Sequence, residues 1–287
     1  MKPAPFTYHR PHSVSDAIKL LSKHKDDAKI LAGGQSLVPM MNFRVARPEF
    51  LIDINRLKEL DYHRIEKGEL VIGALARHAA LRSSEVVRKA CPLMAEAYQH
   101  VAHGPIRNRG TLCGNLCHAD PASEMPAVAL AVDAVLVLTS KRGERRVAAK
   151  DFFLGIYQTA AEPDELLTEV RIPVAPEGQV CSFQEVSVRK GDFALAGVAV
   201  ALTLSGGKVK SAAVAVCGVG NRAARLASVE AKLVGSTLDS KTIDKAAHAA
   251  AEAVNPQSDI NADPIHRRDL VRTLVARTLK EAADRAV

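Results

Sequence analysis

Residues 29–44 hold the first group of residues whose types and spacing suggest chemistry. A short apolar run, Ile30–Leu31, reads as a buried strand that breaks at Gly33–Gly34. Paired glycines remove the Cβ atoms that keep an anion away from the backbone, and they let successive N–H groups converge. Ser36 is placed to cap a helical turn over Leu37–Phe43, whose start adds a partial positive charge. The stretch has neither P-loop nor G-x-G-x-x-G spacing. It predicts a phosphate or pyrophosphate site, and the alternative is an ordinary tight turn.

A second polar stretch, residues 106–126, supplies the other half of a candidate site. It again offers backbone N–H groups and small side chains to a polar ligand. Two acidic residues follow, and either could accept hydrogen bonds from ribose hydroxyls. The residues concerned are Gly110, Thr111, Gly114 and Asn115, followed by Asp120 and Glu124.

Three motifs in this order identify a family resemblance. Ala32-Gly-Gly-Gln-Ser36, Arg107-Asn-Arg-Gly-Thr-Leu-Cys-Gly-Asn115 and Ala119-Asp-Pro-Ala-Ser-Glu124 resemble the FAD-binding medium subunit of molybdenum hydroxylases. The nearest type is the carbon monoxide dehydrogenase medium chain, which is related to the flavin domain of xanthine dehydrogenase. The resemblance runs along essentially the whole chain.

The resemblance implies roles for individual residues. Backbone groups of the first loop should cradle the FAD pyrophosphate, and the second loop should close over it. These loops are Ala32, Gly33, Gly34, Gln35 and Ser36, and Thr111, Leu112, Cys113, Gly114 and Asn115. The family usually has glycine at position 113, so a Cys there would be strained if the position needs positive φ.

The remaining implied contacts each have a plain structural alternative. Glu124 should bind the ribose of the adenosine half, with Asp120 as second choice or as the cap of a turn before Pro121. The resemblance also places several residues near the flavin ring or the adenine. Each of them could instead be an ordinary core residue, a solvated lysine or an aromatic residue of a strand. These are Val101 and Ala102 at the isoalloxazine ring, Leu167 near the adenine, and Lys190 and Phe193 beside the ring.

No catalytic acid, base or nucleophile set is visible, so any chemistry would be the cofactor's. The family role implied is the FAD subunit of a heterotrimeric molybdenum hydroxylase, which accepts electrons from [2Fe–2S] clusters of a partner subunit and passes them to an external acceptor. Its partners would be a large molybdopterin subunit and a small subunit with two [2Fe–2S] clusters, assembled as a dimer of heterotrimers. Two alternatives are a non-catalytic binding or assembly module of the same fold and a free-standing flavin oxidase.

Composition narrows the class further. The 287 residues are 47% hydrophobic, contain no membrane-spanning run, and begin without an apolar signal region, so we expect a cytoplasmic protein. The net charge of +7 is scattered among 32 acidic residues with 4% aromatics, which argues against nucleic-acid binding and fits an acidic protein partner. Cys113, Cys117 and His118 are close in sequence but lack a fourth ligand, so we expect no metal site. Arg44 and Arg47 are interpreted as a solvated face.

The pattern of elements predicts an α+β fold. A first subdomain, about residues 1–56, reads as a βαβ-like unit, and a second, 57–176, has short strands and helices. By resemblance this is a FAD-binding domain of the vanillyl-alcohol-oxidase/PCMH type. After a Pro- and Gly-rich linker, residues 177–287 read as a three-stranded antiparallel sheet with a three-helix bundle. The helices are expected over about Arg222–Val234, Ser240–Val254 and Pro264–Ala283.

Overall fold

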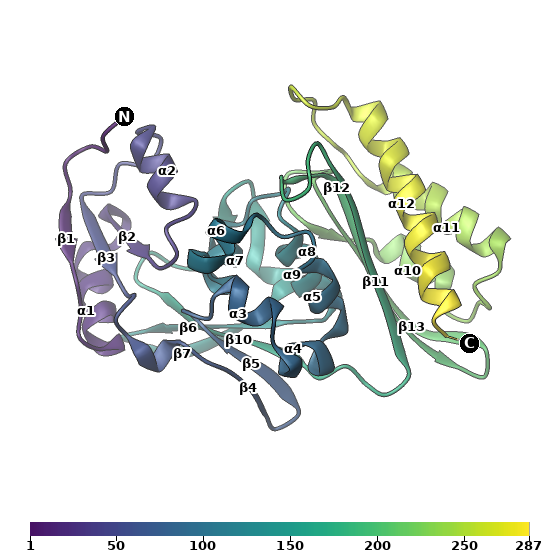
Figure 1. Ribbon diagram of the computed structural model, residues 1–287, viewed down its shortest axis with the longest axis horizontal. Helices are drawn as coiled ribbons and strands as arrows, with labels where there is room; N and C mark the ends of the chain where they lie inside the picture. The colour runs from purple at the N-terminus through teal and green to yellow at the C-terminus, as the bar shows by residue number, and fades with distance from the viewer. Residues whose placement is uncertain (287) are drawn as a thin grey trace.

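The computed structural model describes residues 1–286 and begins with a small parallel sheet of order β1-β3-β2. Helix α1 opens at Ser13, whose hydroxyl accepts the backbone N–H of Asp16 at 3.1 Å, and it buries one apolar stripe. Helix α2 crosses between β2 and β3, which pair in parallel (Figure 1). The bounds are β1 Thr7–His9, α1 Val14–His24, β2 Ala28–Leu31, α2 Leu37–Asn42 and β3 Phe50–Asp53.

The next part of the chain forms a five-stranded antiparallel sheet of order β4-β5-β10-β6-β7. Its strands are β4 His63–Glu66, β5 Glu69–Gly73, β6 Val135–Ser140, β7 Gly143–Ala148 and β10 Leu166–Pro173. Short helices and one hairpin fill the connections: α3 His78–Arg82, α4 Glu85–Ala90, α5 Pro92–Ala97, α6 Gly104–Arg109, α7 Leu112–His118, α8 Glu124–Ala131, α9 Ala149–Phe152, β8 Phe153–Gly155 and β9 Gln158–Thr159. Every residue of α8 is buried, so this helix lies at the centre of the molecule.

The C-terminal part is an antiparallel sheet of order β11-β12-β13-β14 covered by helices. Helices α11 and α12 begin at Asp239 and Asp263, whose carboxylates accept the N–H groups of Thr242 and His266 at 2.8 Å. The bounds are β11 Gln179–Ser187, β12 Ala194–Ser205, β13 Lys208–Cys217, β14 Ala224–Arg225, α10 Ala227–Leu233, α11 Ser240–Ala253 and α12 Pro264–Asp284.

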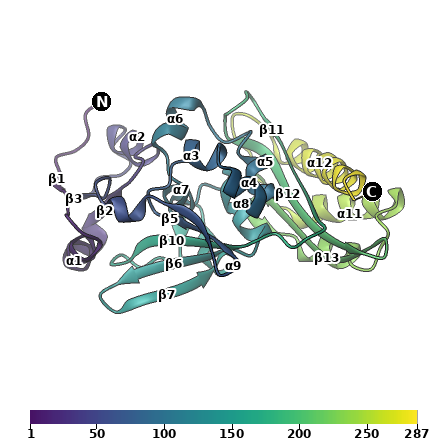
Figure 2. The ribbon, with the colours of Figure 1, turned by 60° about the horizontal axis from the view of Figure 1, so that its bottom comes forward.

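Strand β12 serves two hydrophobic cores, because successive side chains of a strand point to opposite faces. One face joins the core beneath α11 and α12, and the other faces α5 and α8 of the preceding part (Figures 1 and 2). Ala196, Val198, Val200 and Leu202 belong to the first core, and Ala194, Ala199 and Ala201 belong to the second. The C-terminal sheet is therefore packed between two layers of helices.

The α+β fold class is confirmed, with local differences. The C-terminal sheet gains a fourth strand, because residues 224–225 pair with β13 instead of continuing a helix. As a result α10 begins at Ala227 and not at Arg222. Ser36 makes no side-chain cap at α2, so that expectation is wrong. No helix within residues 1–286 is long and apolar enough to cross a membrane.

Candidate functional site

The two predicted phosphate loops lie directly against each other. A Cβ atom added at Gly33 would lie 2.5 Å from the carbonyl oxygen of Arg109 and 2.6 Å from Cα of Gly110. Real Cβ atoms do not approach backbone this closely, so only glycine fits at position 33. Gly34 has φ of +72°, the left-handed region that glycine adopts without strain. Loops at residues 32–36 and 106–115 are thus brought into one site.

A polar bridge that the sequence analysis missed holds the two loops together. The amide nitrogen of Asn55 donates to the carbonyl oxygen of Ala32 at 2.8 Å. The guanidinium of Arg77 donates to Oδ1 of Asn55 at 2.7 Å and also to the carbonyl oxygen of Arg109. Arg77 therefore connects the first loop to the second through Asn55. Neither residue belongs to a local motif, and only the position of Asn55, shortly after the end of strand β3, could have pointed to this bridge.

Thr111 caps helix α7 and fixes the second loop. Its Oγ1 accepts the backbone N–H of Gly114 at 3.1 Å, and a Cβ at Gly114 would lie only 2.8 Å from that oxygen. The amide of Asn115 donates to the hydroxyl of Ser123 at 2.9 Å, which ties α7 to the start of α8. These contacts leave the loop with small side chains and a backbone shaped by glycine.

Cys113 causes none of the strain that its departure from the family pattern suggested. It lies inside helix α7 and is absent from the residues with positive φ. Its side chain is buried in the main core with Sγ 4.0 Å from the carbonyl oxygen of Ile72. Burial raises the pKa of this thiol well above its ordinary value. Cys113 is thus a neutral core residue whose backbone alone is available to the loop.

Asp120 has the contacts of a turn cap. One carboxylate oxygen accepts the backbone N–H of Ala122 at 2.9 Å, and the other accepts the hydroxyl of Tyr157 at 3.3 Å. The turn that it forms is attached to the C-terminal sheet, because the N–H of Gly218 donates to the carbonyl oxygen of Pro121 at 2.7 Å. The structure supports the capping alternative for Asp120, and its ribose contact stays a prediction.

Glu124 is the buried carboxyl of the site. It is 3% exposed at the start of α8, and burial, with a smaller contribution from the carboxylate of Glu185, raises its pKa to about 8. Glu185 lies on β11, and one of its oxygens is 3.4 Å from Nδ1 of His100 while the other is buried without a hydrogen-bond partner. The raised pKa favours the protonated form of Glu124, which can donate as well as accept a hydrogen bond.

The raised pKa of Glu124 predicts a pH-dependent stability. A carboxyl with a raised folded-state pKa stabilises the fold fully below its unfolded value of 4.5, and that contribution is lost as the pH rises through about 8. Burial lowers the pKa of His78 to about 4, so this residue makes the stability rise with pH, but only below pH 6.5. Between pH 6.5 and 8 we expect the free energy of unfolding of the chain without added cofactor to fall by about 2 kcal/mol.

Urea unfolding at several pH values measures this loss, with Glu124→Gln as the matched variant because it keeps shape but cannot titrate. The free energy of unfolding of Glu124→Gln should be nearly independent of pH over the same interval. Equal slopes for the two proteins would contradict the assignment.

The residues expected beside the flavin ring are brought together by two touching loops. A Cβ at Gly191 would lie 3.0 Å from the carbonyl oxygen of Ala102 and 2.9 Å from the ring of His103. Ala102 has φ of +49°, and the guanidinium of Arg107 donates to its carbonyl oxygen and holds this turn. Gly191 stands between the predicted contacts Lys190 and Phe193. Lys190 is exposed and Phe193 is 54% exposed, whereas Val101 and Leu167 are members of the main core.

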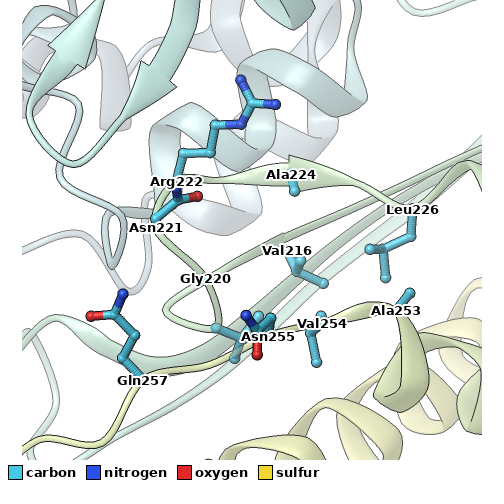
Figure 3. A pocket seen from close by; sticks show the side chains of 11 residues that line it. Val216, Gly220, Asn221, Arg222, Ala224, Leu226, Ala253, Val254, Asn255 and Gln257 are labelled. Carbon is cyan, nitrogen blue, oxygen red and sulfur yellow. The ribbon is translucent and has the colours of Figure 1, made fainter.

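A separate cavity of about 280 Å³ lies in the C-terminal part, between the end of β13 and the end of α11. Figure 3 shows apolar Val216, Val254 and Leu226 around it, with the guanidinium of Arg222 directed away. That guanidinium donates instead to the carbonyl oxygen of Phe153. The cavity shares no residue with the two loops and is not part of the candidate site. Within residues 1–286 no group of three His, Cys, Asp or Glu residues could hold a metal ion.

The site fits the pyrophosphate of FAD in its shape and its charge. Gly33 lets the backbones of the two loops approach each other, because a Cβ there would run into the carbonyl oxygen of Arg109 and Cα of Gly110. The stretches 28–48 and 97–119, which carry both loops, contain no aspartate or glutamate. The loops themselves therefore bring backbone N–H groups and basic side chains, and no carboxylate, to a doubly charged pyrophosphate.

Comparisons with known proteins agree with this site. Residues 4–175 match the FAD binding domain in molybdopterin dehydrogenase, and residues 181–282 match the CO dehydrogenase flavoprotein C-terminal domain. The chain is 43% identical over 287 residues to the 6-hydroxypseudooxynicotine dehydrogenase complex subunit alpha of Paenarthrobacter nicotinovorans, covering 100% of this chain and 97% of the relative. It is 39% identical over 282 residues to the carbon monoxide dehydrogenase medium chain of Hydrogenophaga pseudoflava, covering 98% of both.

The solved carbon monoxide dehydrogenase from Hydrogenophaga pseudoflava contains a chain that superposes with a TM-score of 0.97 at 40% identity, covering 99% of each chain. Two whole-chain relatives, two family matches and this structure confirm the resemblance that the motifs indicated, including FAD as the cofactor. The chain belongs to the family of FAD-binding medium subunits of molybdenum hydroxylases.

Proposed function

We propose that this chain holds FAD between its two glycine-containing loops and relays electrons from the [2Fe–2S] clusters of a partner subunit to an external acceptor. The observation that carries the proposal is the approach of Gly33 to the Arg109–Gly110 backbone, which joins the two loops into one cradle. Bound FAD supplies the electron-transfer chemistry, since the chain has no acid, base or nucleophile set of its own.

The residues of the chain have distinct parts in this proposal. The loop N–H groups bind the pyrophosphate: those of Ala32, Gly33, Gly34, Gln35 and Ser36 on one side and of Thr111 to Asn115 on the other. Glu124 hydrogen-bonds a hydroxyl of the ribose. Lys190 places a positive charge near the ring, which favours added electron density there, and Phe193 shields one ring face from water. Val101, Ala102 and Leu167 line the ring and the adenine.

The proposal also assigns partners and domains. The partners are a large molybdopterin subunit and a small [2Fe–2S] subunit, in a dimer of heterotrimers located in the cytoplasm. Five unpaired cysteines in the described chain are consistent with that reducing compartment. Residues 1–176 are the FAD-binding domain, with subdomains 1–56 and 57–176, and 177–287 are the C-terminal domain. The division falls between the end of β10 at Pro173 and the start of β11 at Gln179.

Reconstitution tests the relay. The isolated chain should bind FAD, show the yellow colour of a flavoprotein, and show no hydroxylase activity. Its flavin absorption should bleach anaerobically with substrate only after the cluster and molybdenum subunits are added, because the chain has no substrate chemistry. Dithionite, which bleaches any accessible flavin, is the positive control.

Each other outcome supports a different function. Substrate-driven bleaching by the chain alone would identify a free-standing flavin oxidase. A folded chain that assembles with its partners but retains no flavin would be a binding or assembly module. Flavin that stays oxidised in the full assembly would remove the relay role.

A further inference from the structure

The three parallel strands of the first sheet end at the edge where the Gly33–Gly34 loop begins. Strand β3 lies in the middle of this sheet, with β1 paired to it on one side and β2 on the other (Figure 1). In open sheets of parallel strands, ligands are bound beyond the carboxyl ends of the strands. Strand β3 ends there with Asp53, whose side chain is buried at 9% exposure. A buried carboxylate at this edge needs hydrogen-bond partners, and its partners connect it to the candidate site.

The two oxygens of Asp53 face different elements. Oδ1 accepts the backbone N–H of Asn55 at 2.9 Å and its side-chain amide at 2.6 Å, and Oδ2 accepts the hydroxyl of Tyr8 on β1. The strand register explains the second contact, because Tyr8 pairs with Leu51, and positions 51 and 53 lie on the same face of β3. Burial raises the pKa of Asp53, but the hydrogen bonds from Tyr8 and Asn55 outweigh burial and lower this pKa below its ordinary value. Asp53 is therefore an ionised acceptor held between β1 and Asn55.

The side-chain amide of Asn55 must face one way to hold both loops. Its nitrogen donates to the carbonyl oxygen of Ala32, and its oxygen accepts a hydrogen bond from Arg77. The reversed amide would set its oxygen against the carbonyl oxygen of Ala32 and its N–H groups against the guanidinium of Arg77. An ionised carboxylate only accepts hydrogen bonds, so Asp53 stabilises only the orientation in which the amide nitrogen faces it. Asp53 thus selects the orientation on which the bridge between the loops depends.

We propose that Asp53 is a positioning residue for FAD binding, which acts through the amide of Asn55, and that Tyr8 on the first strand holds Asp53 in place. The inference rests on the proposed function, in which the two loops together bind the FAD pyrophosphate. It extends the bridge of Asn55 and Arg77 back to the N-terminal strand. The competing explanation is that Asp53 only stabilises the turn after β3, through the backbone N–H of Asn55.

The Kd for FAD, measured by fluorescence titration of the full chain, separates these explanations. Asp53→Ala should raise the Kd about tenfold in the unmodified chain. In the Asn55→Ala background it should raise the Kd by less than about twofold, because the amide through which it acts is already missing. Asn55→Ala keeps the backbone N–H, so a carboxylate that only stabilised the turn would matter equally in both backgrounds. Asp53→Asn, which retains an acceptor oxygen, should recover most of the affinity.

Tyr8→Phe is the variant that disturbs the fold least, because Tyr8 is 46% exposed and only its hydroxyl is removed. It should raise the Kd about threefold and have no further effect in the Asp53→Ala background. The matched control is Asp239→Ala, which removes the carboxylate that caps α11 in the C-terminal part. This control should lower the free energy of unfolding and leave the Kd for FAD unchanged.

Several results would overturn the inference. Equal effects of Asp53→Ala in the two backgrounds would assign Asp53 to the turn alone, and an equal loss of affinity in Asp239→Ala would assign the effect to lowered stability. An unchanged Kd in folded Asp53→Ala and Tyr8→Phe proteins would refute the positioning role and leave FAD binding and the relay standing. If Asp53→Ala does not fold, the same comparison with Tyr8→Phe in the Asn55→Ala background decides. If the unmodified chain binds no FAD, the proposed function fails and the inference fails with it.

Discussion

Replacing Gly33 by alanine should strip FAD from the protein, with retained flavin falling below a tenth of the unmodified level. The added methyl group would lie 2.5 Å from the carbonyl oxygen of Arg109, so the two loops must separate. Separation moves the converging N–H groups apart and disrupts the cradle. The affinity for FAD therefore falls far more than the addition of one methyl group alone would suggest. Flavin absorption after desalting measures the loss, and circular dichroism reports whether the chain stays folded.

Gly104→Ala is the matched control for this change. Gly104 starts helix α6 in the same region, and a Cβ there meets nothing within 4 Å. This variant should keep its flavin. Full FAD occupancy in a folded Gly33→Ala protein would contradict the cradle, and equal flavin loss in both variants would point to general fragility of the region.

Removing the bridge at Arg77 should have the second largest effect. Arg77→Met keeps much of the apolar length of the side chain but leaves Oδ1 of Asn55 and the carbonyl oxygen of Arg109 without their donors. Losing hydrogen bonds to a charged group costs about 1.5–3 kcal/mol each, and the two loops are no longer coupled. We expect FAD to bind about tenfold to a hundredfold more weakly, as measured by titration of flavin fluorescence.

The control for Arg77 is Arg82→Met, which removes an exposed guanidinium that donates to Gln99 at 3.1 Å. That change should alter the FAD Kd by less than about twofold, as expected for a surface position. Asn55→Ala should reproduce most of the Arg77→Met effect, and the double variant should be less than additive because both act through one bridge. Strict additivity would show that Arg77 and Asn55 act separately.

What the sequence could predict was set by local signals. Helices α11 and α12 each begin directly after a capping aspartate, and both were predicted close to their observed bounds. The loop at Gly33–Gly34 could be recognised because its chemistry is contiguous in sequence. Helices α6, α7 and α8 were not predicted, because all three are short. Helix α8 is also apolar on every side, so it has no helical hydrophobic periodicity to detect.

The missed parts of the site depend on contacts between distant residues. Arg77 and Asn55 act only because β3 and the connection after β5 meet beside the second loop, and nothing in either local sequence shows it. The environment of Glu124 was missed for a similar reason. Its burial depends on β12 and β13, which pack on α8, and the carboxylate of Glu185 on β11 makes a smaller contribution to its raised pKa. Such properties come from packing and not from a motif.

The two-sided burial of β12 has a consequence for folding. An excised FAD-binding portion would expose the face of α5 and α8 that β12 and its neighbours cover, and an excised C-terminal portion would expose the alanine-lined face of β12. Neither portion can complete its apolar interior alone, because exposing that much nonpolar surface to water is unfavourable. Although the two portions match two different domain families, heat should therefore unfold the chain in a single calorimetric transition. Cleavage of the linker between them should leave the two portions associated.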